Sequence, residues 1–146
     1  MSESIIRIDR STSPVYPDWV TRVLHPELGS VGPAEYDLAT IGLWLHDGQK
    51  NDAKMHGDRI YGYLKSENML GRCLGLRDGE EIRKKGVRIF RTFFGGRSLF
   101  LWKSVVEFNG DLRVPAIPYG GEGDIRWVWL GFDWRSIDPA GLHRSR

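Results

Sequence analysis

The residue types that come nearest to a catalytic set lie between Trp44 and Lys50, in the sequence Trp-Leu-His-Asp-Gly-Gln-Lys. His46 is the candidate general base, with Asp47 to orient it, and Lys50 or Arg59 is the candidate cation for a developing phosphate charge. Such a set would serve a small hydrolase or nuclease. His46 and Asp47 are adjacent, however, so their side chains diverge on a helix or a strand. Catalysis is therefore the alternative function, and the sequence favours a protein that is not an enzyme.

Ligands for a metal ion are scarce in this sequence. It contains four histidines and a single cysteine, Cys73. Nine residues lie between His46 and His56. This spacing matches no common pair of metal ligands, and metal sites usually need three or four ligands. The chain also lacks a phosphate-binding loop and a dinucleotide-binding glycine motif. The sequence predicts no metal and no cofactor.

A strong asymmetry of charge lies behind the small net charge of +2. The range Ile82–Val106 contains seven basic residues and no acidic residue. If its first part is helical, Lys84, Arg88 and Arg91 fall within one stripe, because each residue turns the helix by about 100°. Such a ridge attracts nucleic-acid phosphates or acidic protein surfaces. The alternative interpretation is an ordinary solvated helix face whose cations complement the helix dipole.

Six tryptophans give the chain a second feature that suits recognition. Trp102 and Trp127 lie on predicted strands and are candidates for aromatic anchors at an interface. Arg97 and Lys103 extend the cationic ridge. Apolar residues occupy both faces of these strands, so either helices cover both faces or one face exposes an apolar patch. The alternative interpretation is that the tryptophans fill a thin core.

Hydrophobic periodicity and capping residues predict the elements that must position these side chains. One helix is expected to run to Phe94, with Asp78 as its N-cap and Glu81 reaching back to the backbone. The range Pro33–Lys50 has the spacing of a helix and also the alternation of a strand, and Pro33 favours a first helical turn. The other predicted helices are Tyr16–Leu24 and Asp58–Leu70, after a short strand at Ile5–Ile8.

After Gly96 the hydrophobic period changes to two. Asn109-Gly110 is a strong signal for a type I′ hairpin turn, which needs positive φ at both central residues. Pro115 has no amide hydrogen, so its strand is expected at an edge or with a bulge. The predicted fold is α+β: a helical N-terminal half packed on a C-terminal antiparallel three-stranded meander. Its strands are expected at Ser98–Phe108, Leu112–Ile117 and Ile125–Phe132.

The length of 146 residues suits one compact domain. We expect a single domain over residues 1–146, with frayed ends near 1–4 and 138–146. The first ten residues include charged side chains where a signal peptide would be apolar, and no long apolar run follows. A single cysteine excludes an internal disulfide framework. These features predict a soluble cytoplasmic protein that does not bind membranes.

Together these observations favour a non-enzymatic binding module that engages nucleic acid or an acidic protein surface. A hydrolase or nuclease that uses His46, Asp47 and Lys50 is the alternative. A homo-oligomer that buries an aromatic sheet face is a third possibility, and the sequence leaves the oligomeric state open. The predicted contact residues are Lys84, Arg88, Arg91, Arg97, Trp102, Lys103 and Trp127.

Overall fold

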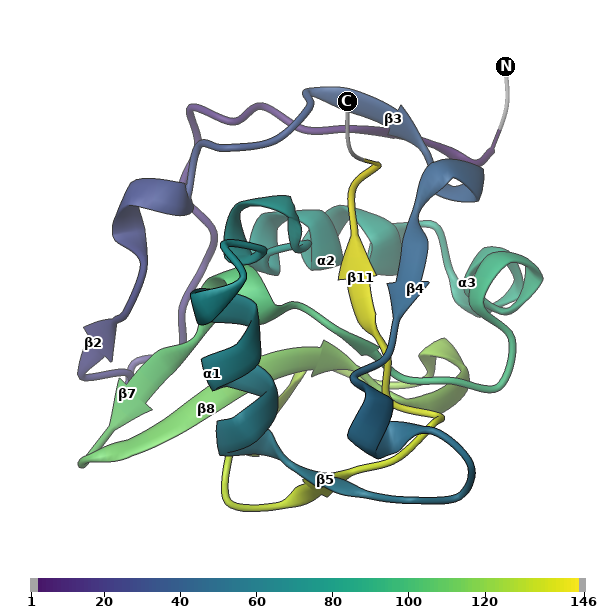
Figure 1. The fold of residues 1–146 in the computed structure, drawn as a ribbon. Helices are drawn as coiled ribbons and strands as arrows, with labels where there is room; N and C mark the ends of the chain where they lie inside the picture. The colour runs from purple at the N-terminus through teal and green to yellow at the C-terminus, as the bar shows by residue number, and fades with distance from the viewer. Residues whose placement is uncertain (1–2, 145–146) are drawn as a thin grey trace.

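A seven-stranded sheet forms the centre of the computed structural model, which describes residues 3–144 (Figure 1). Its strand order is β2–β7–β8–β6–β11–β4, and β9 pairs with the other edge of β8. The strands are β2 (Arg22–Val23), β4 (Gly42–Trp44), β6 (Leu99–Phe100), β7 (Val106–Phe108), β8 (Asp111–Ile117), β9 (Arg126–Trp129) and β11 (Ala140–Leu142). All neighbours are antiparallel except β6 and β11, which are parallel.

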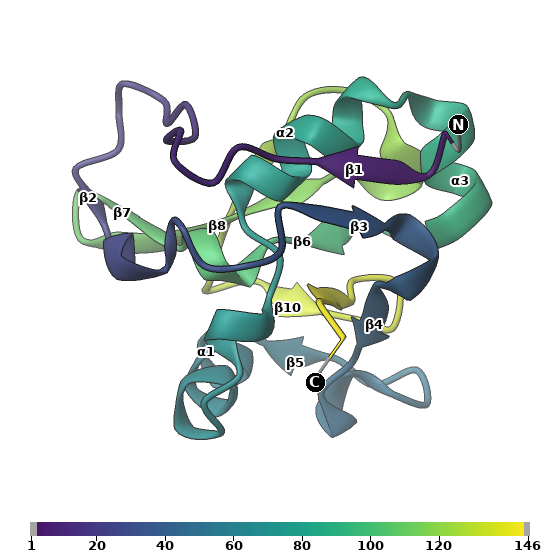
Figure 2. The same cartoon turned by 90° about the horizontal axis from the view of Figure 1, so that it is seen from above.

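Two layers cover the two faces of this sheet (Figures 1 and 2). One layer contains helix α1 and the β5–β10 pair, and the other contains helices α2 and α3 with the β1–β3 pair. The additional elements are α1 (Gly57–Ser66), α2 (Leu76–Lys84), α3 (Val87–Phe94), β1 (Ile5–Arg7), β3 (Glu35–Asp37), β5 (Met55–His56) and β10 (Asp133–Trp134). The molecule is one compact domain with mixed α and β structure.

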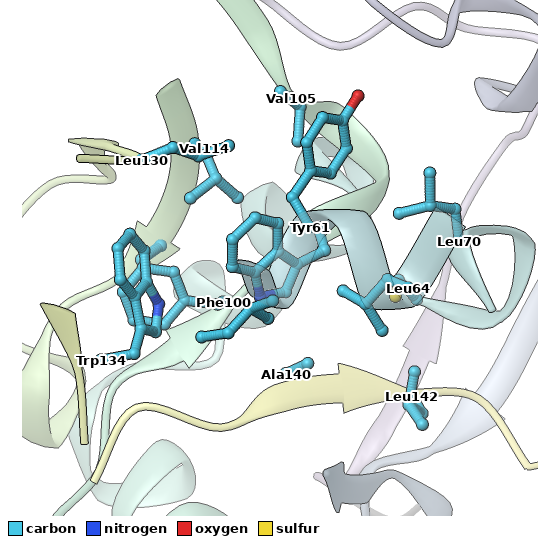
Figure 3. Packing of buried hydrophobic residues seen from close by; sticks show 14 residues of the cluster. Tyr61, Leu64, Leu70, Phe100, Val105, Val114, Leu130, Trp134, Ala140 and Leu142 are labelled. Carbon is cyan, nitrogen blue, oxygen red and sulfur yellow. The ribbon is translucent and has the colours of Figure 1, made fainter. Parts of the chain in front are cut away.

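Alternating side chains of the sheet fill a separate core on each face. Phe100 and Trp102 pack with Tyr61 of α1 and with Trp134, as Figure 3 shows for the labelled members. Leu99 belongs to the opposite core, with the apolar faces of α2 and α3. Helices therefore cover both faces, and this explains why both parities of the strands are apolar in the sequence.

The hairpin predicted at Asn109-Gly110 is confirmed. Asn109 and Gly110 have φ values of 49° and 87°, and they join β7 to β8 in an antiparallel pair. Opposite Pro115 the partner strand is interrupted, because β6 and β7 are separated by a 3-10 turn at Trp102–Ser104. The carbonyl of Pro115 still accepts a hydrogen bond from the amide of Leu101 at 3.0 Å. β8 is an inner strand, so the missing amide hydrogen is accommodated by this break and not by an edge.

Two predicted N-terminal helices are wrong. The range Pro33–Lys50 contains β3, β4 and two 3-10 turns, so its alternation was the signal that decided the structure. The range Tyr16–Leu24 forms no helix and ends in β2, which pairs with β7. Both segments gain their backbone partners from distant strands, and such long-range pairing overrides local capping signals. The helix at Asp58–Leu70 is confirmed in part, as α1 and a following 3-10 turn.

The single helix predicted to follow Asp78 is divided into two helices. Gly86 has φ +92° and separates α2 from α3. Asp78 is the third residue of α2, where its carboxylate accepts a hydrogen bond from the amide of Gly75 at 2.8 Å. Asp78 therefore makes only the reciprocal half of a capping box, from N3 to the amide of the N-cap Gly75, and α2 begins about one turn earlier than the sequence pattern suggested.

The position of β11 corrects two predictions, the three-stranded meander and the frayed C-terminus. This strand lies inside the sheet, with Ala140 opposite both Phe100 of β6 and Trp44 of β4. Ala140 and Leu142 are buried, so residues 138–144 are an integral part of the fold. At the other end, Ser4 is buried as well, and residues 1–2 and 145–146 lie outside the described residues. No helix within residues 3–144 is long and apolar enough to span a membrane.

Candidate functional site

The three cations of the predicted ridge lie on the surface, but on two helices and each beside a carboxylate. Lys84 ends α2, whereas Arg88 and Arg91 belong to α3. Exposed ion pairs of this kind contribute little to stability and reduce the local excess of positive charge. The pairs are Lys84–Glu81 at 3.0 Å, Arg88–Glu3 at 2.9 Å and Arg91–Glu122 at 3.1 Å.

Two arginines of this region fix the glycine-rich segment that precedes β9. Arg83 donates from Nε to the carbonyl of Gly123 at 3.1 Å and pairs with Asp124 at 3.1 Å. Arg91 donates from Nε to the carbonyl of Gly120 at 3.2 Å. Part of the positive charge between Ile82 and Val106 therefore holds this glycine-rich segment in place.

The remaining predicted contact residues of the sheet are less exposed than expected. Trp102 is completely buried, so the prediction that it contacts a partner is wrong: the sheet face on which it lies is covered by α1. Trp127 is half-buried, with its ring 5.5 Å from that of Trp19 and 6.2 Å from that of Tyr16. The N-terminal segment of the chain thus covers the aromatic face that the sequence offered to a partner.

Arg97 and Lys103 have different environments. Arg97 is exposed and donates to the carbonyl of Phe94 at 3.1 Å. Lys103 was expected to extend the exposed ridge, and this is wrong because its side chain is buried. The 3-10 turn at Trp102–Ser104 directs Lys103 under the N-terminal segment, next to the start of α2.

The residues of the alternative catalytic site line one pocket of about 330 Å³, together with Trp44 and Tyr63. His46 caps the turn at Asp47–Gln49, and its Nδ1 accepts a hydrogen bond from the amide of Gly48 at 2.9 Å. The neutral imidazole must then carry its proton on Nε2, so neither nitrogen is placed to accept a proton from a substrate. Asp47 pairs with Lys50 at 3.0 Å instead of orienting His46. Arg59 does not line this pocket.

A smaller and more unusual site lies where the N-terminal segment crosses the start of α2. We call it the Lys103 cavity; its volume is about 150 Å³. Ser13, Pro26 and Gly29 at its border are exposed, so the cavity reaches the surface. Its polar and charged lining consists of Arg10, Ser13, Tyr16, His25, Arg77, Asp78, Lys103 and Ser104.

Lys103 is the decisive residue of this cavity. Its side chain is only 4% exposed, and its Nζ donates to the carbonyl of Val31 at 2.7 Å. Among the residues that the structure describes, no carboxylate lies within ion-pair distance of this ammonium group. Burial lowers the pKa of Lys103, and the charge of Asp78 opposes that shift only in part. A buried cation without a paired anion is costly.

Asp78 does not neutralise Lys103 because its own charge is already shared. Its Oδ1 accepts from the hydroxyl of Tyr36 at 2.8 Å and pairs with Arg10 at 3.1 Å, and the residue is fully buried. His143 Nε2 lies 3.3 Å away, near enough for a charge contact but without the alignment of a hydrogen bond. Burial alone would raise the pKa of Asp78, but the contacts with His143 and Arg10 outweigh it and lower that pKa.

The first turn of α2 completes the cavity. Ser104 Oγ accepts a hydrogen bond from the amide of Leu76 at 2.7 Å, and the Ser104 hydroxyl also contacts the hydroxyl of Tyr16. The amide of Arg77 also lies in this first turn, where backbone N–H groups have no partner inside the helix. Leu76, Arg77 and Lys103 all line the cavity. The arrangement is suited to an anion.

Sequence reasoning named Lys103 but missed its neighbours. Arg10 and Asp78 are 68 positions apart and meet only because the N-terminal segment folds over α2. The sequence predicts that Asp78 caps a helix, and it does accept a hydrogen bond from the Gly75 amide. That role does not reveal its buried ion pair with Arg10. Nothing in the spacing of these residues signals the cavity.

Comparisons with known proteins add no assignment to these sites. No family model matches the chain, and neither the curated proteins nor the solved structures contain a match. Within residues 3–144, no cluster of histidine, cysteine and acidic side chains has the arrangement of a metal site.

Proposed function

We propose that this chain is a non-enzymatic binding module and that the Lys103 cavity receives an oxyanion, a carboxylate or a phosphate, presented by its partner. The observation that supports this proposal is the buried ammonium group of Lys103, which has a carbonyl partner but no paired carboxylate among residues 3–144. An entering anion would supply the missing negative charge. This function keeps the anionic class of partner that the basic residues suggested.

The dimensions and donors of the cavity support a single oxyanion group. Its volume of about 150 Å³ exceeds the ~30 Å³ share of one water molecule in the liquid, so a carboxylate or phosphate fits with part of its carrier. Lys103 and the first turn of α2 both line the cavity and supply its donors. Charge-assisted hydrogen bonds of this kind are about twice as strong as neutral ones.

Isothermal titration calorimetry with inorganic phosphate and with acetate tests this proposal. We expect both anions to bind, and Lys103→Met to weaken binding at least about tenfold, because a hydrogen bond to a charged group contributes roughly 1.5–3 kcal/mol. Lys84→Met is the matched control: Lys84 is exposed and lies outside the cavity, so its loss should leave the affinity within about twofold. Equal binding by wild type and Lys103→Met would overturn the proposal.

The source of the oxyanion is then distinguished with larger probes. An acidic protein segment is represented by a capped glutamate peptide, and nucleic acid by a short oligothymidylate. Whichever probe binds with the same dependence on Lys103 as the free anion identifies the class of partner. If neither does, the cavity serves a free small anion.

A second candidate function rests on the exposed cations at the α2–α3 corner. The side chains of Lys84 and Arg88 are 71% and 73% exposed, and Lys85 between them is exposed as well. A nucleic-acid backbone could displace their weak carboxylate partners. Fluorescence anisotropy with labelled RNA, single-stranded DNA and duplex DNA at two salt concentrations tests this function. Charge reversal of Lys84, Arg88 and Arg91 to Glu should abolish any binding that weakens steeply with salt.

A further inference from the structure

A second groove lies on the α1 side of the sheet, next to β9, and shares no lining residue with the Lys103 cavity. We call it the Trp134 groove; its volume is about 450 Å³. Phe100 and Ala116 of the sheet belong to its floor, and Trp134 of β10 lies beside them. Tyr119 and Phe132 at its border are each 58% exposed. Exposed aromatic side chains around a concave surface are typical of recognition sites.

The indole of Trp134 requires a partner that the described residues do not provide. Trp134 is 1% exposed, and its Nε1–H has no hydrogen-bond acceptor within residues 3–144. A buried donor without an acceptor is destabilising. Trp134 also lines the groove, so its indole N–H resonance can report on a ligand bound there.

The charges at the border of the groove favour a basic ligand. Asp133, Asp138 and Glu122 line it, although Glu122 is already paired with Arg91, and Arg126 is the only basic residue among its lining residues. Asp133 is 45% exposed and has only a distant cation, Lys54 Nζ, at 3.9 Å. One oxygen of Asp138 accepts from the backbone amide of Arg135 at 3.0 Å, which leaves its charge uncompensated by any described cation. A guanidinium or ammonium group would complement this border.

The outer edge of β9 gives the ligand a backbone to pair with. In the described part of the chain, β9 pairs only with β8. Since the carbonyl of Pro115 points to β6, its neighbours Val114 and Ala116 point to β9, where they lie opposite Val128 and Arg126. The backbone N–H and C=O groups of Trp127 must therefore point outward from the edge of the sheet, away from β8. An extended peptide can add a strand to such an edge.

From these observations we propose that the Trp134 groove and the β9 edge bind an extended segment of a partner protein that contains an arginine or lysine side chain. The segment pairs with Trp127 through its backbone. Its basic side chain lies beside Asp133 and Asp138, in the groove that Trp134 lines. This binding is independent of the anion at Lys103.

Nuclear magnetic resonance of the indole N–H groups tests this proposal directly. The probe is a capped pentapeptide in which valine and arginine alternate, and its control has glutamate in place of arginine. The Trp134 resonance is assigned by its disappearance in Trp134→Phe. We expect the arginine peptide to shift this resonance in a saturable way and the glutamate peptide to have no effect. No shift with the arginine peptide at millimolar concentration, or equal shifts with both peptides, would overturn the proposal.

Two further measurements separate the side-chain and backbone contributions. Asp133→Asn combined with Asp138→Asn should weaken binding of the arginine peptide at least about threefold, whereas Asp111→Asn, an exposed residue at the far end of β8, should not. In an extended peptide only every second N–H group faces β9. Methylation of that set of nitrogens should abolish binding because it removes the donors that pair with β9, whereas methylation of the other set should not. Equally tight binding of the two methylated peptides contradicts the strand addition.

Discussion

Asp78 and Arg10 form a buried ion pair, Nη2 to Oδ1 at 3.1 Å, that fixes the N-terminal segment to the start of α2. The same carboxylate accepts from Tyr36 of β3 and lies beside His143 after β11. One fully buried residue thus joins both ends of the chain to the helix. This carboxylate also lines the Lys103 cavity, where it is engaged by Arg10 and Tyr36 and forms no ion pair with Lys103.

Removing the charge of Asp78 should destabilise the whole domain. Asp78→Ala leaves Arg10 buried without its anion, which costs about 3–5 kcal/mol in comparable sites. Urea denaturation followed by tryptophan fluorescence measures this loss. Asp124→Ala is the control, since the Asp124 side chain is 98% exposed and its surface pair contributes about 0–1 kcal/mol. Equal losses for the two variants would show that Asp78 has no special role.

Acid should destabilise the protein through the same residue. The pKa of Asp78 is lower in the folded protein than in the unfolded chain, so its stabilising contribution is complete above the ordinary aspartate pKa of about 3.9 and is lost as the pH falls below it. The free energy of unfolding, measured in urea between pH 6 and pH 2.5, should fall more steeply for the wild type than for Asp78→Asn. Parallel slopes would contradict this assignment.

Lys103→Met should leave the unliganded protein as stable as the wild type or more stable. The ammonium group is buried, and none of the described residues pairs it with an anion, whereas methionine fills a similar volume without a charge to desolvate. The expected change lies between about 0 and +2 kcal/mol in urea denaturation without added anion. Phosphate should then stabilise the wild type and not the variant, because only a ligand that binds the folded state raises its stability. A large loss of stability without phosphate would show that Lys103 is structural.

Gly86 should be required for the break between α2 and α3. Its φ of +92° is unfavourable for any residue with a Cβ atom, although open space surrounds the position. Gly86→Ala should therefore destabilise the protein by about 1–3 kcal/mol. Gly62→Ala in the exposed face of α1, where a Cβ also meets no atom, should instead stabilise it by about 0.5–1 kcal/mol. Thermal unfolding of the two variants checks this opposite sign.

The sequence was informative where a local interaction decides the structure. Asn109-Gly110 specifies its turn through its own backbone preferences, and the periodic apolar residues of α2 and α3 locate both helices. It failed where short segments obtain partners from far along the chain. β2, β4 and β11 have two or three residues each, too few for a reliable period, and all three depend on the central sheet for their hydrogen bonds.

The same contrast between local and long-range interactions applies to the candidate sites. Charge counting found the basic residues between Ile82 and Val106, but it could not show that Glu3 and Glu122 return to pair with them. Lys103 was identified as basic, whereas its burial depends on the segment near Val31 that folds over it. The Trp134 groove could not be predicted at all, because its walls come from β6, β8, β9 and β10.

The most direct test of the central claim is the pKa of Lys103 itself, measured from the ¹³Cε chemical shift with and without inorganic phosphate. Without the anion, burial should hold this pKa below the ordinary lysine value of about 10.4. Phosphate in the cavity stabilises the charged form, so the pKa should rise in its presence, and anion affinity should fall as the pH rises through that range. A Lys103 pKa that phosphate leaves unchanged would contradict the account, because no anion would then be bound beside this ammonium group.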